Sequence, residues 1–129
     1  MRKFLLTALV VCATVFPAGC GKRGPVLAGG KPVGHWVQAL QDPDARVRKK
    51  AVAKLRNVGP ADPAVLPALV GALEDRDPHV RYEAVQALVS YGPGAEEALP
   101  ALAEVQRRER NARVRAVAAQ ALEKLQARR

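Results

Sequence analysis

The side chains that could perform covalent or metal chemistry are few in this 129-residue chain. Cys12 and Cys20 are its two thiols, and the part after Cys20 contains no Thr, one Ser (Ser90) and two His (His35 and His79). A Ser–His–acid site would have to bring Ser90 to a His on a different turn. Two isolated His with scattered carboxylates also lack the spacing of metal ligands. The sequence therefore predicts no catalytic residue, no cofactor and no metal site.

Basic side chains are far more abundant than potential nucleophiles. The chain contains 21 Lys and Arg against 12 Asp and Glu, which gives a formal net charge of +9. This charge permits anionic partners such as phosphate groups, acidic lipids or acidic polysaccharide, and it selects none of them. The composition, 49% hydrophobic and 26% charged, indicates a folded chain with room for one domain and an appendage. Because only 4% of the residues are aromatic, we expect a core of Ala, Val and Leu.

The N-terminal segment has the pattern of a signal peptide. An apolar run over residues 4–16 follows the basic Met1-Arg2-Lys3. This run is shorter than the ~20 residues of a bilayer-spanning helix, and it has the length of a signal-peptide apolar region. We therefore predict a signal peptide over residues 1–19. Its removal would leave Cys20 as the only thiol, which excludes an internal disulfide and a cysteine metal site. The alternatives are an ordinary secretory signal or an uncleaved anchor, in which Cys20 has no role.

The residues around Cys20 resemble the lipobox of bacterial lipoproteins. Ala18-Gly19-Cys20 fits that motif, and Pro17 occupies the position that usually holds Leu. The resemblance implies that Cys20 is lipidated and that the chain is cut just before it. More than one acyl chain gives stable anchoring, whereas a single chain binds a membrane only marginally. No acidic residue follows Cys20 directly. By resemblance to the sorting rule of some bacterial lipoproteins, this favours the outer membrane of a bacterial cell envelope as the address.

Residues 20–34 have the composition of a tether. The segment Gly21–Gly34 contains five Gly, two Pro and three basic residues. Such a composition is typical of a flexible linker, so we expect it to hold the folded part just off the membrane. Its basic residues either keep the linker soluble or contact lipid headgroups.

One helical pattern occurs three times in the rest of the chain. Val47–Leu55 and Val80–Leu88 both fit V-R-x-x-A-V-x-x-L, and Val114–Leu122 fits it with Ala119 in place of the second Val. The apolar positions recur at spacings of three and four, as on one face of a helix. A residue type that favours helix N-caps stands three positions before the first Val of each copy. These residues are Asp44, Asp77 and Asn111.

A second apolar segment precedes each copy of the pattern. Leu66–Leu69 recurs as Leu99–Leu102, and the same offset places Trp36 at the position of Leu69. Trp36 is therefore predicted to cap the first repeat, with a binding anchor as the alternative. We expect no strands, and an extra residue of the third repeat in the turn between Gln106 and Asn111. The expected helices are 33–41, 44–57, 63–74, 78–90, 95–108 and 112–127.

The repeated residues D-x-x-V-R-x-x-A-V-x-x-L, followed by Gly-Pro, resemble the HEAT repeat. The closest likeness is to its short bacterial form, first noted in phycobilisome lyases, the enzymes that attach pigments to phycobiliproteins. The resemblance covers Val33–Leu125 and implies an all-α fold, a short right-handed α-solenoid of three helix pairs within residues 35–127. The pairs are placed at about 33–59, 62–92 and 95–125. The resemblance also implies that the second helices line the concave side and that one Arg of each copy bridges neighbouring repeats to an acidic group. These residues are Arg48, Arg81 and Arg115.

The exposed positions of the three second helices form the predicted partner-binding face. That face is basic at its first repeat and milder across the other two. Its residues are Arg46, Lys49, Lys50, His79, Tyr82, Glu83, Gln86 and Arg113. We predict a membrane-anchored scaffold that binds a protein or peptide here without covalent chemistry. One alternative is a lyase or chaperone-like accessory subunit. Another is an array that binds nucleic acid, if the N-terminal apolar run is not a processed signal; export argues against it.

Overall fold

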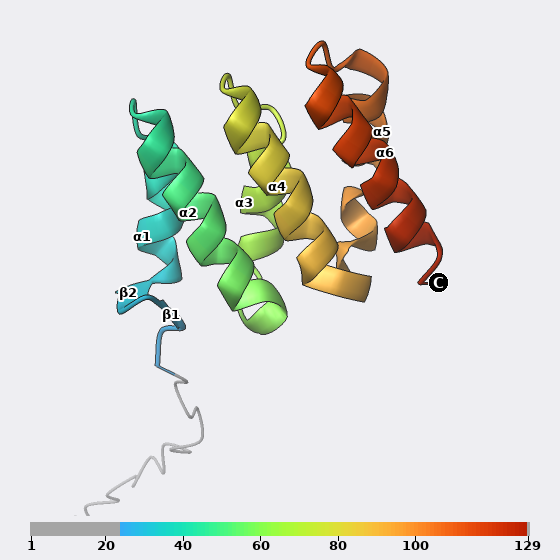
Figure 1. Cartoon of the computed structure of the whole chain (residues 1–129). Helices are drawn as coiled ribbons and strands as arrows, with labels where there is room; N and C mark the ends of the chain where they lie inside the picture. Colours follow the sequence, from blue (N-terminus) through green and yellow to red (C-terminus); the bar gives the residue numbers. More distant parts are fainter. Residues whose placement is uncertain (1–23, 129) are drawn as a thin grey trace, which may run out of the picture.

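The fold is a stack of three helix pairs, described by a computed structural model over residues 24–128 (Figure 1). Within these residues there are six α-helices, so the predicted all-α solenoid of three pairs is confirmed. The predicted signal peptide (1–19), lipidated Cys20 and first tether residues lie outside the described part. The helices are α1 (Val33–Ala39), α2 (Ala45–Val58), α3 (Val65–Ala72), α4 (Pro78–Tyr91), α5 (Leu99–Arg108) and α6 (Ala112–Gln126).

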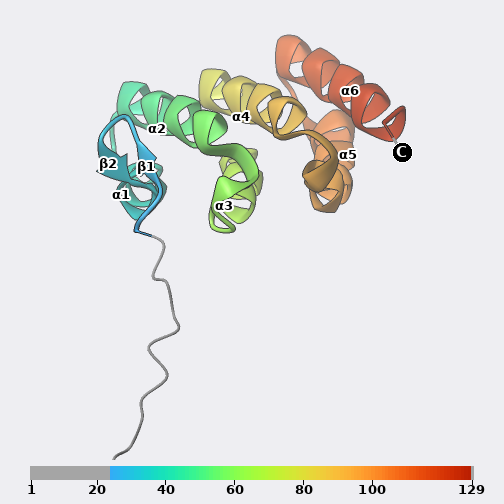
Figure 2. The same cartoon turned by 90° about the horizontal axis from the view of Figure 1, so that it is seen from below.

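The helices form two layers, each containing one helix from every pair (Figure 2). We call α2, α4 and α6 the second-helix layer, and α1, α3 and α5 the first-helix layer. Neighbours within the second-helix layer pack closely against each other, whereas neighbours within the first-helix layer hardly touch. The second-helix layer therefore presents a continuous surface, and grooves open between the first helices.

The helix boundaries follow from capping residues. The side chain of Asp77 accepts the backbone N–H groups of His79 and Val80, as predicted. Asn111 caps α6 with the same two bonds, and Asp44 caps α2 with one, from the backbone N–H of Arg46. Gly92 ends α4 with a φ of 84°, a left-handed conformation that side chains with a Cβ rarely adopt. A short 3-10 helix follows α2 (Gly59–Ala61) and another follows α4 (Gly92–Ala98).

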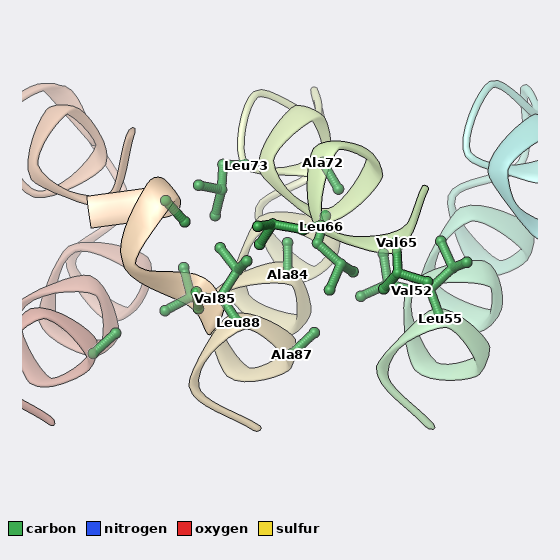
Figure 3. Close-up of a cluster of buried hydrophobic side chains, with 14 of the residues drawn as sticks. Val52, Leu55, Val65, Leu66, Ala72, Leu73, Ala84, Val85, Ala87 and Leu88 are labelled. Atoms are coloured by element: carbon green, nitrogen blue, oxygen red, sulfur yellow. The ribbon is translucent and has the colours of Figure 1, made fainter. Parts of the chain in front are cut away.

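The core is most of the predicted apolar stripe of each second helix, packed on the first helices (Figure 3). Val47 and Ala119 of the predicted stripes are only half-buried, and Val117, predicted to be exposed, is buried in the core instead. In the middle pair, Ala84, Val85 and Leu88 are fully buried, and Figure 3 shows them gathered with Leu66 of α3. Leu69 and its equivalent in the third pair, Leu102, are also fully buried. Because these side chains are small or medium-sized, the stack is held by many modest apolar contacts.

The second half of the predicted tether is folded, which corrects the expectation of a linker to Gly34 and of no strands. Strands β1 (Leu27–Ala28) and β2 (Lys31–Pro32) form an antiparallel hairpin. Its two-residue turn, Gly29-Gly30, has φ values of 58° and 79°, the conformation that a tight hairpin turn requires. A Gly-Gly pair that is ambiguous in a linker thus encodes a turn here, because apolar neighbours give the hairpin a surface to pack on.

The hairpin covers the first helix pair through Trp36. The indole Nε1–H of Trp36 donates a hydrogen bond of 2.7 Å to the carbonyl oxygen of Ala28, and both residues are buried. Gly29 lies against the side chain of Lys54 on α2. Lys54 occupies the position that is a buried Ala in the other two pairs, Ala87 and Ala121. Trp36 therefore packs where Leu69 and Leu102 pack, and the hairpin provides the cover that the other pairs receive from a neighbour.

The extra residue of the third repeat lies in a helix, which corrects the prediction that it lengthens a turn. Helix α3 ends at Ala72, and five residues separate it from α4, whereas α5 continues to Arg108 and three residues separate it from α6. The last turn of α5 carries Arg107 and Arg108, both of which pair with Glu104 one turn earlier. These ion pairs favour continuation of the helix. The predicted α5 start at residue 95 was early, because residues 92–98 form a 3-10 helix.

Candidate functional site on the second-helix layer

Charge is strongly segregated between the parts of the fold. Helices α2, α4 and α6 carry ten basic residues and only two acidic ones, Glu83 and Glu123. The other ten acidic residues lie in the loops, the 3-10 segments and α5. The basic residues of the second-helix layer are Arg46, Arg48, Lys49, Lys50, Lys54, Arg56, Arg81, Arg113, Arg115 and Lys124. This layer therefore has a positive potential toward solvent.

A depression of about 160 Å³ lies where the first turns of α4 and α6 meet, with Lys49 reaching it from α2. Five of the eight predicted face residues line it, so residues far apart in the sequence meet at one place. Of the predicted face residues, Arg46, Lys50 and Gln86 are not part of its wall. The lining residues are Lys49, Pro78, His79, Tyr82, Glu83, Asn111, Arg113 and Val114.

Tyr82 is held in the depression by contacts from two helices. The guanidinium carbon of Arg113 lies 4.7 Å from the centre of the Tyr82 ring, a cation–π contact between α6 and α4. Gln86, one turn further along α4, donates from Nε2 to the Tyr82 hydroxyl at 3.3 Å. The ring and the guanidinium thus orient each other. Among residues 24–128 Arg113 has no ion-pair partner, so its N–H groups remain available to an anion.

Two of the predicted face residues are engaged within the fold. Glu83 is half-buried and forms a 3.8 Å ion pair with Arg56 across the boundary between α2 and α4. Arg46 is 93% exposed and lies on the capping carboxylate of its own helix, Asp44, at 3.2 Å. The backbone N–H of Arg46, and then its side chain, lower the pKa of Asp44. Lys49 and Lys50 differ from these two, because both are exposed and form no ion pair within the described chain.

The predicted Arg ladder is present at both boundaries between helix pairs. Arg48 is buried, and its Nε and Nη2 donate to the two carboxylate oxygens of Asp75 at 2.8 and 3.1 Å. Arg81 donates in the same way to Glu109, at 2.7 Å for both contacts. The pKa of Glu109 is lowered, first by the hydrogen bonds from Arg81. Arg115 donates to the backbone carbonyl of Glu109 instead, because no further helix pair in the described chain supplies a carboxylate. For Arg115 the expected acidic bridge was wrong.

The ladder carboxylates have a second role that the sequence analysis missed. Asp75 accepts the backbone N–H of Asp77 at 2.8 Å, and Glu109 accepts that of Asn111 at 2.9 Å. Each carboxylate therefore closes its own loop while it pairs with the Arg of the preceding repeat. The available signal was the acidic residue two positions before each N-cap, a spacing typical of side-chain to backbone turns.

Within residues 24–128, the His and Ser side chains do not come together. His79 lies near the start of α4 and Ser90 near its end, which separates them by ~16 Å along the helix. The Ser90 hydroxyl donates to the carbonyl of Gln86, and the His35 ring stacks edge-on against Trp36. No group of three or more His, Cys, Asp or Glu within residues 24–128 is placed to hold a metal ion.

None of the helices between residues 24 and 128 combines the length and the apolar character that crossing a membrane requires.

The repeats match a known family. A family model described as HEAT repeats covers residues 33–123, from the start of α1 almost to the end of α6. No curated protein matches the chain.

Proposed function

Because this chain belongs to the HEAT-repeat family, we propose that it is a non-catalytic scaffold that binds a protein or peptide partner through its second-helix layer. The observation that carries this proposal is the depression around Tyr82, where three helices contribute side chains to one continuous basic surface. Rigid helices fix these side chains, so binding rests on shape and charge complementarity.

The second-helix layer is a better docking surface than the first-helix layer. The grooves between the first helices contain the ladder residues Arg48 with Asp75 and Arg81 with Glu109, whose hydrogen-bonding groups are already occupied within the fold. On the second-helix layer, Lys49, Lys50 and Arg113 still have donors to offer a partner.

Affinity capture tests the proposed face. The protein with Lys49→Glu and Lys50→Glu should lose partners that the unmodified protein retains from envelope extracts. The matched control is Arg107→Glu with Arg108→Glu, which makes the same change in net charge on exposed side chains of α5. Circular dichroism confirms that both variants fold. Equal recovery by the two variants would exclude the second-helix layer as the binding face.

We also propose that the protein is exported, lipidated at Cys20 and anchored to a membrane of a bacterial cell envelope, with the outer membrane favoured. The sequence around Cys20 supports this, and the position of the hairpin limits the length of the tether. Because the fold begins at the hairpin, six residues separate Cys20 from Leu27, and the seven Cα-to-Cα steps between them reach at most ~25 Å. The first helix pair would therefore lie close to the lipid surface.

Intact-mass measurement on protein from its native membrane tests the anchor. The expected mass lacks residues 1–19 and includes acyl chains, and Cys20→Ala should abolish the acylation. A chain that still begins at Met1 without added mass would refute the lipoprotein assignment. A lipidated Cys20 also weighs against the lyase alternative, because no other thiol would remain for thiol chemistry.

A further inference from the structure

We propose that the partner segment is acidic, and that one of its carboxylates binds in the depression between Lys49, Tyr82 and Arg113. This inference rests on the proposed function, because it specifies the chemistry of the partner that docks on the second-helix layer. Three features of the structure carry it: the distribution of charge, the state of Arg113 and the acidic rim of the layer.

The first feature is the near absence of acidic groups from the layer. Glu83 lines the depression, but its carboxylate pairs with Arg56, and Glu123 lies beyond the depression in the second half of α6. Among the lining residues, Lys49 and Arg113 are cationic, and His79 has a ring that can donate to an anion. An acidic segment therefore meets attraction across the layer, whereas a basic segment meets repulsion.

The second feature is the orientation of Arg113. Its guanidinium lies over the ring of Tyr82 at 4.7 Å, so one face is covered and its direction is fixed before a ligand arrives. A guanidinium held in this way still has the N–H edge that forms two parallel hydrogen bonds to a carboxylate. Fixing the side chain in advance lowers the entropy that binding would otherwise lose. The site is thus prepared for a planar, two-oxygen group.

The third feature distinguishes a peptide from a continuous polyanion. A capping carboxylate, Asp77, stands at the N-terminal end of α4, directly before the lining residues Pro78 and His79, and forms an acidic rim there. A membrane surface or a nucleic-acid backbone carries phosphates at regular, close intervals and would place some of them against this acidic rim. A peptide can present single carboxylates to the depression of about 160 Å³ and neutral residues to the rim.

The test uses the full chain in detergent solution and two 12-residue peptides labelled with a fluorophore. One peptide alternates Glu and Ser, and its control alternates Gln and Ser. At ~0.15 M salt, where distant charges are screened, fluorescence anisotropy should show that the Glu peptide binds at least about tenfold more tightly than the Gln peptide. Arg113→Ala should weaken binding of the Glu peptide by about tenfold, the size expected for a charged hydrogen-bonding pair. Arg107→Ala, which removes an equal charge from α5, should leave binding unchanged.

Two further variants guard against a general charge effect. Tyr82→Phe retains the ring under Arg113 and should bind normally. Tyr82→Leu removes the ring, and with it the orientation of Arg113, and should weaken binding of the Glu peptide. Equal affinity for the Glu and Gln peptides, or equal losses from Arg113→Ala and Arg107→Ala, would overturn the proposal.

The alternative anionic partners are separate arms of the same experiment. Dihexanoylphosphatidylglycerol, a short-chain lipid compatible with detergent solution, and an oligothymidine strand should bind more weakly than the Glu peptide. Arg113→Ala should not change their binding. Tighter, Arg113-dependent binding of either one would replace the acidic peptide with a membrane or nucleic acid. If Lys49→Glu with Lys50→Glu still abolishes capture while the Glu peptide shows no preference, the scaffold function stands and the acidic-partner inference fails. If the Glu peptide binds as expected while capture is unaffected, the proposed function fails instead.

Discussion

Arg81 and Glu109 form a two-point ion pair across the boundary between the second and third helix pairs, with both N–O contacts at 2.7 Å. A third donor of the same guanidinium, Nη1, binds the backbone carbonyl of Asp75 at 2.8 Å. One side chain thus joins its own loop to the loop of the next repeat. Arg48 makes the equivalent contacts one repeat earlier, to Asp75 and to the carbonyl of Asp42. The relative position of successive pairs is therefore set by hydrogen bonds as well as by apolar packing.

Removal of Arg81 should destabilise the stack. The Glu109 side chain is only 6% exposed, so Arg81→Ala leaves a nearly buried carboxylate without its partner. We expect a loss of roughly 2–3 kcal/mol in the free energy of unfolding, because such a carboxylate loses both its pair and its solvation. Urea denaturation followed by circular dichroism measures this loss. The surface variant Arg107→Ala should lose under ~1 kcal/mol, and a similar effect of both variants would contradict the structural role of the ladder.

The same pair should make stability depend on pH below neutrality. Hydrogen bonds from Arg81 lower the pKa of Glu109 in the folded state below the ~4.3 of an unfolded chain. A depressed folded pKa stabilises the fold above the unfolded pKa, and this stabilisation is lost as the pH falls through the lower, folded value. The free energy of unfolding should therefore fall from about pH 5 downward, and less steeply in Glu109→Gln. Asp44 and Glu104, whose pKa values are also lowered, titrate in both proteins and cancel in the difference. Parallel pH curves for the two proteins would show that Glu109 does not carry the effect.

The apolar core should unfold as one unit. Leu88 is fully buried in the middle pair, so Leu88→Ala should lower the free energy of unfolding by ~3 kcal/mol, through lost burial and the cavity left behind. Ser90→Ala, at an exposed position of the same helix, should change it by less than ~0.5 kcal/mol. Fluorescence of Trp36, the only Trp, reports on the first pair, while circular dichroism reports on all three. Coincident shifts of both signals are expected, because three repeats are about the minimum for a stable array; separate transitions would mean that the pairs unfold independently.

Repetition explains why so much of the scaffold could be predicted. The positions of Asp77, Val80 and Arg81 recur in all three copies and were predicted as an N-cap, a core residue and a ladder residue. Local spacing predicts the first two roles, although Val47 of the first copy is only half-buried. The resemblance to HEAT repeats supplied the third role, and the structure confirms it for Arg48 and Arg81.

The structure differs from the sequence-based predictions at positions where the three repeats have different surroundings. Arg115 occupies the position of Arg81 in its copy, yet within residues 24–128 it has no carboxylate partner, because the carboxylates that pair with Arg48 and Arg81 come from the following helix pair. Glu83 appeared free for a partner, and only the packing of α4 on α2 brings it to Arg56. The depression around Tyr82 was predicted as a set of exposed residues, but which of them meet depends on the offset between neighbouring helices.

The hairpin is the part of the chain that repetition could not predict, and Trp36 provides a direct test of it. Gly30 has a φ of 79° with open space where a Cβ would stand, so Gly30→Val strains the backbone without a steric clash. A β-branched residue in this conformation should disfavour the hairpin by ~1–2 kcal/mol. The loosened strand no longer holds the Ala28 carbonyl on the indole, which is joined to it at 2.7 Å in the native fold. We expect a red shift of Trp36 fluorescence and stronger quenching by acrylamide.

Gly34→Ala is the matched control for the hairpin. It lies four residues further on, in the first turn of α1, where its φ is not positive and nothing lies within 4 Å of an added Cβ. This variant should leave the fluorescence of Trp36 unchanged and should slightly stabilise the helix, because Ala favours helix more than Gly does. Fluorescence that is identical in Gly30→Val and in the unmodified protein would show that the segment before α1 does not cover Trp36. Trp36 would then be available as the binding anchor that the sequence left as an alternative.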